Sequence, residues 1–150
     1  MDGLRPNVNS RVWTIGYEGW KIDSFIDRLK KAGIKQLIDV REIPVSRKKG
    51  FSKSALKANL EAAGLIYKHI PELGSPSDVR NEYKAGGSID EFMTRYKTYM
   101  ETQLESYDLL KGMALVRPSA IMCMEKEFMI CHRRIIADRL KLEGFNISHL

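Results

Sequence analysis

Residues 120–134 read AIMCMEKEFMICHRR, and this stretch contains the pattern from which the expected fold is built. Its first five residues form a short apolar run, which is typical of a buried strand. A charged segment follows, and residues 130–142 then show the spacing of a helix, with Ile135, Ile136 and Leu140 on its buried side. The stretch therefore predicts a strand, a loop and a helix in that order.

The same alternation of strand and helix continues toward both ends of the chain. Apolar, β-branched and aromatic runs predict further strands at residues 12–15, 36–40, 65–70 and 145–150. Strands that alternate with helices indicate a parallel sheet with right-handed crossovers. We therefore expect an α/β fold, with a single domain over residues 11–150 in which a mostly parallel sheet of about five strands lies between two layers of helices. A small barrel-like closure of the strands is the alternative.

The helices between these strands are predicted from their caps, their apolar stripes and the glycines that end them. Shorter helices are expected at residues 23–33, 52–64 and 77–83. The longest is expected from Ser88 to Tyr107, because Met and aromatic residues recur along one face, as in a helix that covers a core. The polar residues 1–10 are expected to form a flexible lead-in.

Composition limits the class of protein and its partners. The chain has 150 residues and a formal net charge of +6, which favours phosphates or nucleic acid as partners, although solvated lysines alone also account for it. No apolar stretch approaches the roughly 20 residues of a membrane span, and the N-terminus lacks an apolar signal segment. We expect a cytoplasmic protein that does not enter a membrane. Its two cysteines are then free, metal-bound or reactive.

Polar and titratable side chains follow four of the five predicted strands. In chain order they are Tyr17 and Glu18; Asp39, Arg41 and Arg47; His69 and Glu72; and Cys123, Glu125, Cys131, His132 and Arg133. The carboxyl ends of parallel strands meet at one edge of the sheet, where ligands of open α/β folds bind. The sequence therefore predicts a polar cleft at this edge.

The residue types suggest an enzyme that acts on an anionic substrate, such as one that carries a phosphate. The anion-binding residues would be Arg41, Arg47, Arg133 and His132; the catalytic residues would be Cys123, Glu125, Cys131 and Asp39; and Tyr17, Glu18, His69 and Glu72 would line the site. Cys131 is predicted to be the more reactive thiol, because a helix N-terminus and Arg133 would both stabilise its thiolate.

Two other functions remain open from the sequence. In the first, the chain is a nucleic-acid-binding module, in which the basic loop at residues 47–49 contacts phosphates while Tyr17, Trp20 and Phe51 stack on bases. In the second, the polar residues are structural, and Asp39–Arg41 and Glu125–Arg133 ion pairs fasten strand ends to helices.

No cofactor is predicted, and zinc is the alternative for the two cysteines. Cys123, Cys131 and His132 offer three ligands, and Glu125 or His69 could supply a fourth, but the spacing is not that of a zinc finger. A disulfide is also open if the strand end and the helix start approach within about 6 Å.

Five motifs in this order resemble the "domain of unknown function 488" family, which is found in bacteria and archaea. They are TIGYE at 14–18, DVR-x-x-P at 39–44, GFSK at 50–53, PELGSP at 71–76 and the C-x-E-K…CHRR segment at 123–134. The resemblance covers residues 12–150 and implies no established reaction; some members carry labels that connect them with nucleic acid or DNA repair. The family pattern marks Gly16, Asp39, Arg41, Pro44, Ser52, Glu72, Leu73, Gly74, Cys123, Glu125, Cys131, His132 and Arg133.

Overall fold

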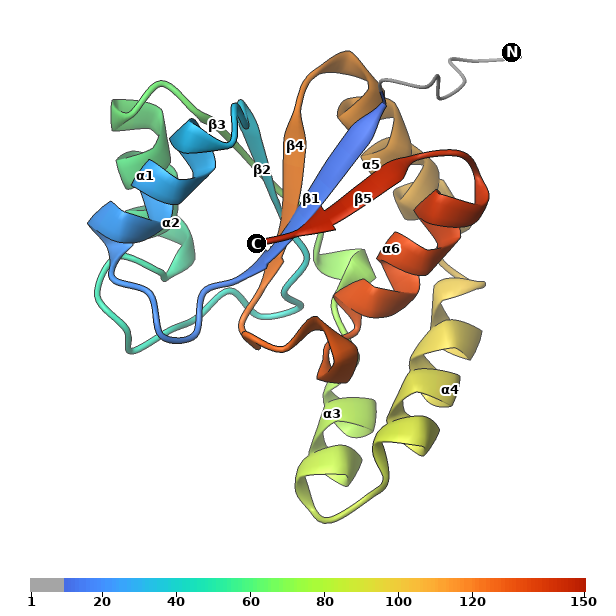
Figure 1. Ribbon diagram of the computed structural model, residues 1–150. Coiled ribbons are helices and arrows are strands. Elements are labelled where there is room, and N and C mark those ends of the chain that lie inside the picture. Colours follow the sequence, from blue (N-terminus) through green and yellow to red (C-terminus); the bar gives the residue numbers. More distant parts are fainter. Residues whose placement is uncertain (1–9) are drawn as a thin grey trace.

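The described residues, 10–150 of the computed structural model, form one parallel sheet with helices on both faces (Figure 1). The predicted lead-in at residues 1–10 lies, except for Ser10, outside the described part. The strands are β1 (Arg11–Gly16), β2 (Gln36–Asp39), β3 (Ile66–His69), β4 (Ser119–Cys123) and β5 (Asn146–His149). They lie in the order β3-β2-β4-β1-β5, and each pairs in parallel with its neighbours.

The two faces of the sheet are covered by different helices. α1 (Ile22–Lys31) and α2 (Lys53–Ala62) pack on one face, whereas α4 (Ile89–Met100), α5 (Leu104–Val116) and α6 (Arg133–Leu142) pack on the other (Figure 1). Side chains of β4 alternate between them, so that Ala120 and Met122 face the first group while Ile121 and Cys123 face the second. The predicted α/β fold with helices on both faces is confirmed. The sheet stays open, because β3 and β5 are its edges, so the barrel alternative does not occur.

The single long helix predicted from Ser88 to Tyr107 is wrong. The chain leaves α4 after Met100 and begins α5 at Leu104, with a turn in which the N–H of Gln103 donates to the Met100 carbonyl at 2.8 Å. The apolar stripe runs through this break in the sequence, because Met100 at the end of α4 and Tyr107 in α5 both pack in the same core cluster. The turn redirects α5 along the sheet toward β4.

α3 (Ser77–Lys84) matches the short helix predicted at residues 77–83, and it lies beside α4 below the sheet in Figure 1. Its Val79 packs with Phe92 and Met93 of α4 in a small separate cluster. This pairing holds α3 next to the carboxyl edge of the sheet. Within the described residues, no helix has the length and apolar character needed to cross a membrane.

The last helix begins three residues later than predicted. Residues Phe128–Ile130 form a short 3-10 helix, in which the N–H of Ile130 donates to the carbonyl of Glu127, and α6 starts only at Arg133. Cys131 therefore precedes the helix rather than lying within it. The apolar Met129 and Ile130, which precede Cys131, are exposed.

Candidate functional site

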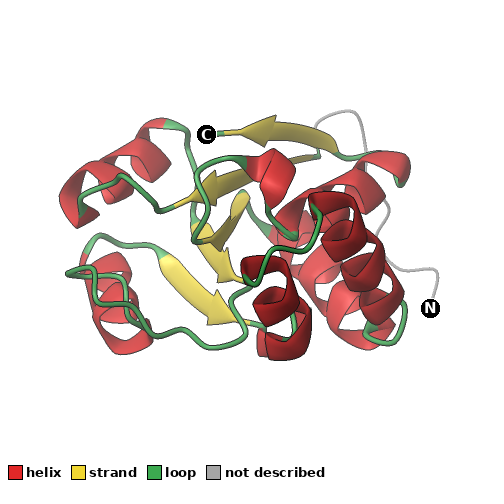
Figure 2. Ribbon diagram, turned by 90° about the horizontal axis from the view of Figure 1, so that it is seen from below, coloured by secondary structure: helices red, strands yellow, loops and turns green. Residues whose placement is uncertain are grey.

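The topology opens a crevice at the carboxyl end of β4. The chain passes from β1 and β2, the neighbours of β4, to α1 and α2 on one face, whereas it passes from β4 to α6 on the other. Loops that leave adjacent strands in opposite directions leave a gap between them, and ligands of open α/β folds bind in such gaps. Figure 2, seen from below, looks toward this edge of the sheet.

A cleft of about 440 Å³ lies at this edge. Of the predicted site residues, those that line it are Tyr17, Arg41, Cys123, Glu125 and His132. They come from the segments after β1, β2 and β4, which are far apart in the sequence. The loop of Glu125 can pass this close to β1 because residue 16 is a glycine. Any side chain at this position would place a Cβ atom on the Glu125 carbonyl.

Asp39 and Arg41 form a buried ion pair at the end of β2. The Arg41 Nε donates to Asp39 Oδ1 at 2.9 Å, and Nη2 donates to Oδ2 at 2.7 Å. Oδ2 also accepts from the Tyr67 hydroxyl at 2.6 Å, and Arg41 Nη1 donates to the Phe51 carbonyl. Burial opposes the charge on Arg41, but the hydrogen bonds and charge of Asp39 outweigh it and raise the pKa of Arg41. Asp39 is fully buried and holds this guanidinium in place.

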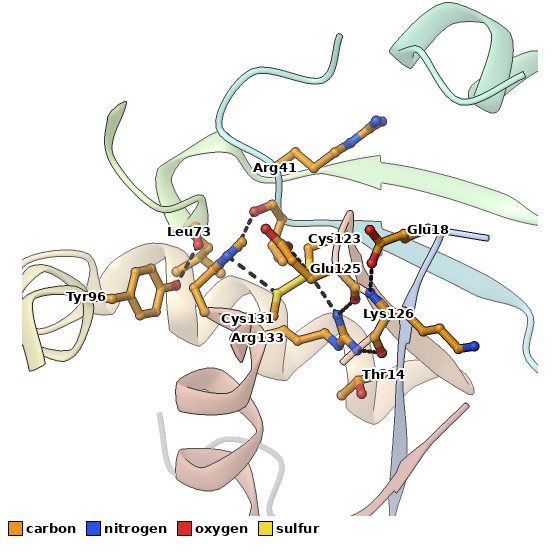
Figure 3. The surroundings of a disulfide bond; sticks show 12 residues. Thr14, Glu18, Arg41, Leu73, Tyr96, Cys123, Glu125, Lys126, Cys131 and Arg133 are labelled. Carbon is orange, nitrogen blue, oxygen red and sulfur yellow. Dashed lines mark hydrogen bonds between the residues drawn. A yellow bond between two sulfur atoms is a disulfide. The ribbon is translucent and has the colours of Figure 1, made fainter. Parts of the chain in front are cut away.

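Arg133, at the start of α6, is also buried but has different partners (Figure 3). Its Nη1 donates to Cys123 Sγ at 2.9 Å and to the Glu125 carbonyl, and Nη2 donates to the Lys126 carbonyl at 3.1 Å. None of these acceptors is a carboxylate, and Nε has no partner within the described chain. Burial lowers the pKa of Arg133 to about 10, although the charges of Glu125 and Glu127 act in the opposite direction. The predicted Asp39–Arg41 ion pair is therefore present, whereas Arg133 contacts the backbone of Glu125 rather than its carboxylate.

The two cysteines and His132 meet between β4 and α6. Cys123 and Cys131 are joined by a disulfide, with their Cα atoms 7.5 Å apart (Figure 3). His132 Nδ1 lies 3.7 Å from Cys131 Sγ, and Nε2 lies 2.7 Å from the carbonyl oxygen of Val40. Because a carbonyl can only accept, Nε2 carries the hydrogen and Nδ1 keeps its lone pair. Burial disfavours the imidazolium and lowers the pKa of His132 to about 4, so that the ring is neutral at pH 7.

The features expected to activate Cys131 lie elsewhere in the structure. α6 begins two residues after Cys131, and the guanidinium of Arg133 contacts Cys123 rather than Cys131. Glu125 Oε2 also lies near Cys123, 3.4 Å from its Sγ. The guanidinium and the carboxylate therefore both lie beside Cys123 rather than Cys131.

Seven predicted site residues lie outside the cleft lining: Asp39, Cys131 and Arg133, described above, and Glu18, Arg47, His69 and Glu72. Glu18 accepts from the N–H of Lys126 at 3.2 Å and so supports the loop after β4. The Nε2 of His69 lies 2.6 Å from the Arg41 carbonyl oxygen, which fixes the backbone behind Arg41. Arg47 and Glu72 are exposed.

Two basic residues of α3 line the cleft and were not predicted. Arg80 donates to the Ser75 carbonyl at 2.7 Å and lies 3.4 Å from Glu42 Oε1, while Lys84, one helical turn further on, is exposed. Their spacing of four residues places them on one side of a short helix. That spacing was visible in the sequence, but the position of the helix over the sheet edge was not.

Of the three aromatic residues proposed for base stacking, Tyr17 and Phe51 do not form an open platform, whereas Trp20 is half-buried. Tyr17 and Phe51 stack on each other with ring centroids 4.8 Å apart, and both are buried. Arg41 lies over the ring of Tyr17, with its guanidinium carbon 5.2 Å from the centroid. These rings therefore support Arg41 and offer no free face to a base.

Comparison with known proteins identifies one family. The family model described as "Domain of unknown function DUF488" matches residues 21–140, which include α1 to α5 and most of α6. In the comparisons with curated proteins and with solved structures, none matches the chain.

Proposed function

This chain belongs to the DUF488 family, and we propose that its cleft binds an anionic, phosphate-bearing small molecule and presents it to Glu125 and the two cysteines. The observation that carries the proposal is the convergence of Arg41, Arg80 and Lys84 on one hollow at the carboxyl edge of the sheet. These three cations come from two segments of the chain.

The cations differ in how firmly they are held. The planar guanidinium of Arg41 is fixed on one side by two hydrogen bonds to Asp39, which is the arrangement that pre-orients a group for bidentate contact with an anion. Arg80 is held by Ser75 and by the Ser77 hydroxyl, at 2.7 and 3.1 Å. Lys84 is exposed at the rim, so it attracts the ligand as a mobile charge.

Glu125 is the best placed general acid–base. It is half-buried and lines the cleft, with Oε2 3.4 Å from Cys123 Sγ. Asp39, the other predicted carboxylate, is fully buried, and its oxygens accept from Arg41 and Tyr67. A carboxylate occupied in this way is not available to move a proton on a ligand.

Titration of the protein with inorganic phosphate, with phenyl phosphate and with a short single-stranded oligonucleotide tests the proposal by calorimetry. We expect both small phosphates to bind. Arg80→Gln should weaken that binding roughly tenfold or more, because a charge-assisted contact contributes about 1.5–3 kcal/mol, whereas Lys84→Gln should weaken it by only about a few-fold, because an exposed charge contributes about 1 kcal/mol or less. Matched controls are Arg28→Gln in α1 and Lys57→Gln in α2, which are exposed and lie outside the cleft lining.

Three results would overturn the proposal. One is that neither small phosphate binds, and another is that the control variants weaken binding as much as the cleft variants. The third is that the oligonucleotide alone binds, with an affinity that falls steeply as salt is added, which would favour a nucleic-acid-binding module.

A further inference from the structure

The side chains of Cys123, Cys131 and His132, between β4 and α6, bring together a compact set of atoms that can bind a metal ion. Cys123 Sγ, Cys131 Sγ and His132 Nδ1 all lie within 4.8 Å of one another, and all three residues are buried. Cys123 ends β4, whereas Cys131 and His132 immediately precede α6. The set is thus anchored by two regular elements, which is how precise metal sites are usually held.

The orientation of His132 suits a ligand. Its Nε2–H donates to the Val40 carbonyl at 2.7 Å, and the Nδ1 lone pair lies on the side of the sulfurs, 3.7 Å from Cys131 Sγ. Metal-bound histidines almost always donate their other ring nitrogen to a carbonyl or carboxylate in this way.

The distances also suit zinc. Tetrahedral bonds of about 2.3 Å to sulfur and about 2.0 Å to nitrogen place ligand atoms roughly 3.5–3.8 Å apart, close to the 3.7 Å between Cys131 Sγ and His132 Nδ1. The Cα separation of 7.5 Å exceeds the 5.5–6 Å or so of most disulfides, and a metal ion between two sulfurs spans more than a direct bond does.

The surrounding charges balance such a site. A divalent cation, two thiolates and a neutral imidazole sum to zero. Glu125, with Oε2 3.4 Å from Cys123 Sγ, is within reach of the fourth position and would bring the total to −1. The buried guanidinium of Arg133, which has no carboxylate among its hydrogen-bond partners and donates to Cys123 Sγ, supplies the opposite charge.

We propose that the reduced protein binds one Zn²⁺ through Cys123, Cys131 and His132, with Glu125 as fourth ligand, and that the disulfide is the oxidised, metal-free form of the same site. A dithiol reductant supplies two electrons and two protons, which break the S–S bond and give two thiols while the dithiol becomes a cyclic disulfide. Zinc then displaces both thiol protons. The proposal goes beyond anion binding and does not depend on it. Glu125 is a ligand in the zinc-bound form, so its acid–base role belongs to the metal-free form.

Titration with Co²⁺, which replaces zinc and absorbs visible light, tests the site directly. Protein reduced with a phosphine and held without oxygen should bind one equivalent, with a thiolate-to-cobalt charge-transfer band and the intense visible bands of tetrahedral cobalt, and Zn²⁺ should bleach both. The oxidised protein should show neither band. Absence of stoichiometric cobalt binding by the reduced wild-type chain would overturn the proposal, whatever the result with phosphate.

Variants identify the ligands. Cys123→Ser and Cys131→Ser should each reduce the charge-transfer band by about half, and His132→Gln should weaken metal affinity at least tenfold. The matched control is His69→Gln, because His69 also directs Nε2 to a backbone carbonyl at this edge but lies outside the ligand set. An unchanged charge-transfer band in both serine variants, or equal losses of affinity with His69→Gln and His132→Gln, would contradict the assignment. If a variant fails to fold, the comparison of cobalt binding by the reduced and the oxidised wild-type protein still tests whether the two thiols bind metal.

Discussion

Two buried arginines at the carboxyl edge of the sheet, Arg41 after β2 and Arg133 after β4, differ in what balances their charge. Arg41 makes a bidentate pair with Asp39, which raises its pKa. Arg133 has a sulfur and two carbonyls as acceptors, and burial lowers its pKa to about 10. Since an unpaired buried charge is costly, the second arginine marks a site that is completed when an anion forms beside it.

The histidines of the two regions extend the comparison. His69 and His132 both direct Nε2 to carbonyls of consecutive residues, Arg41 and Val40. Only His132 has sulfur next to its other nitrogen. In the Arg41 region the buried guanidinium therefore already has a carboxylate that balances its charge. The Arg133 region is arranged like a site whose anions are thiolates, and the predictions below test this contrast.

The largest expected effect is on stability when the Arg41 pair is broken. Asp39→Ala leaves a buried guanidinium without its carboxylate and should lower the free energy of unfolding by about 3–5 kcal/mol. Urea denaturation measures this loss. The control is Asp27→Ala, which removes the exposed pair with Lys31 and should cost about 0.5 kcal/mol or less. Similar losses in the two variants would mean that the Asp39–Arg41 pair is not a main fastening of the sheet edge.

The next effect is a pH dependence that comes from His132. Its pKa falls from 6.5 in the unfolded chain to about 4 in the folded protein, so the unfolded state binds more protons between these pH values. The contribution of the neutral His132 ring to the free energy of unfolding is therefore fully present above pH 6.5. The free energy of unfolding should fall by about 3 kcal/mol as the pH drops from 6.5 to 4. Unfolding of the oxidised, chelator-treated protein across this range measures the loss.

His132→Gln provides the comparison, because glutamine does not titrate. The difference between the two pH profiles isolates the histidine, and parallel profiles would show that His132 is not buried as a neutral ring. The charge of Arg133 also disfavours the imidazolium. Arg133→Met should therefore reduce the slope of the wild-type profile.

The smallest effect is expected for Arg133→Met in the oxidised protein. It removes hydrogen bonds to two carbonyls but also removes an unpaired buried charge, so the free energy of unfolding should fall by less than about 2 kcal/mol. Arg41→Met, measured in the same way, should lower the free energy of unfolding by a larger amount, because it leaves the buried Asp39 carboxylate without its charged partner. Equal costs would remove the distinction between the two arginines.

Much of the fold followed from local patterns. The run at residues 120–124 predicted a strand because each residue of β4 is buried, and such a run is apolar on both faces. The long helix was mispredicted because one apolar stripe continues across the break between Met100 and Leu104. The C-terminal half of α5 gave little signal, since it has both exposed and buried apolar residues, such as Leu109 and Leu110.

The site was predicted in part by a rule about strand ends. That rule placed Tyr17, Arg41 and Glu125 at one edge, and all three line the cleft. It could not find Arg80 or Lys84, because α3 follows no strand end directly and reaches the cleft by packing on α4. The rule also included Arg47 and Glu72, which share the edge but lie outside the cleft lining.

The sequence by itself determined the alternation of strands with helical segments, the parallel sheet and the edge at which polar residues gather, because these depend on the spacing of apolar residues along the chain. Only the tertiary structure decided that Arg133 contacts Cys123 rather than Cys131, and that His132 is buried with its Nδ1 beside the sulfurs. The physical reason is that side-chain direction depends on where α6 begins and on how its first turn packs against β4. That packing joins residues whose contacts no local spacing specifies.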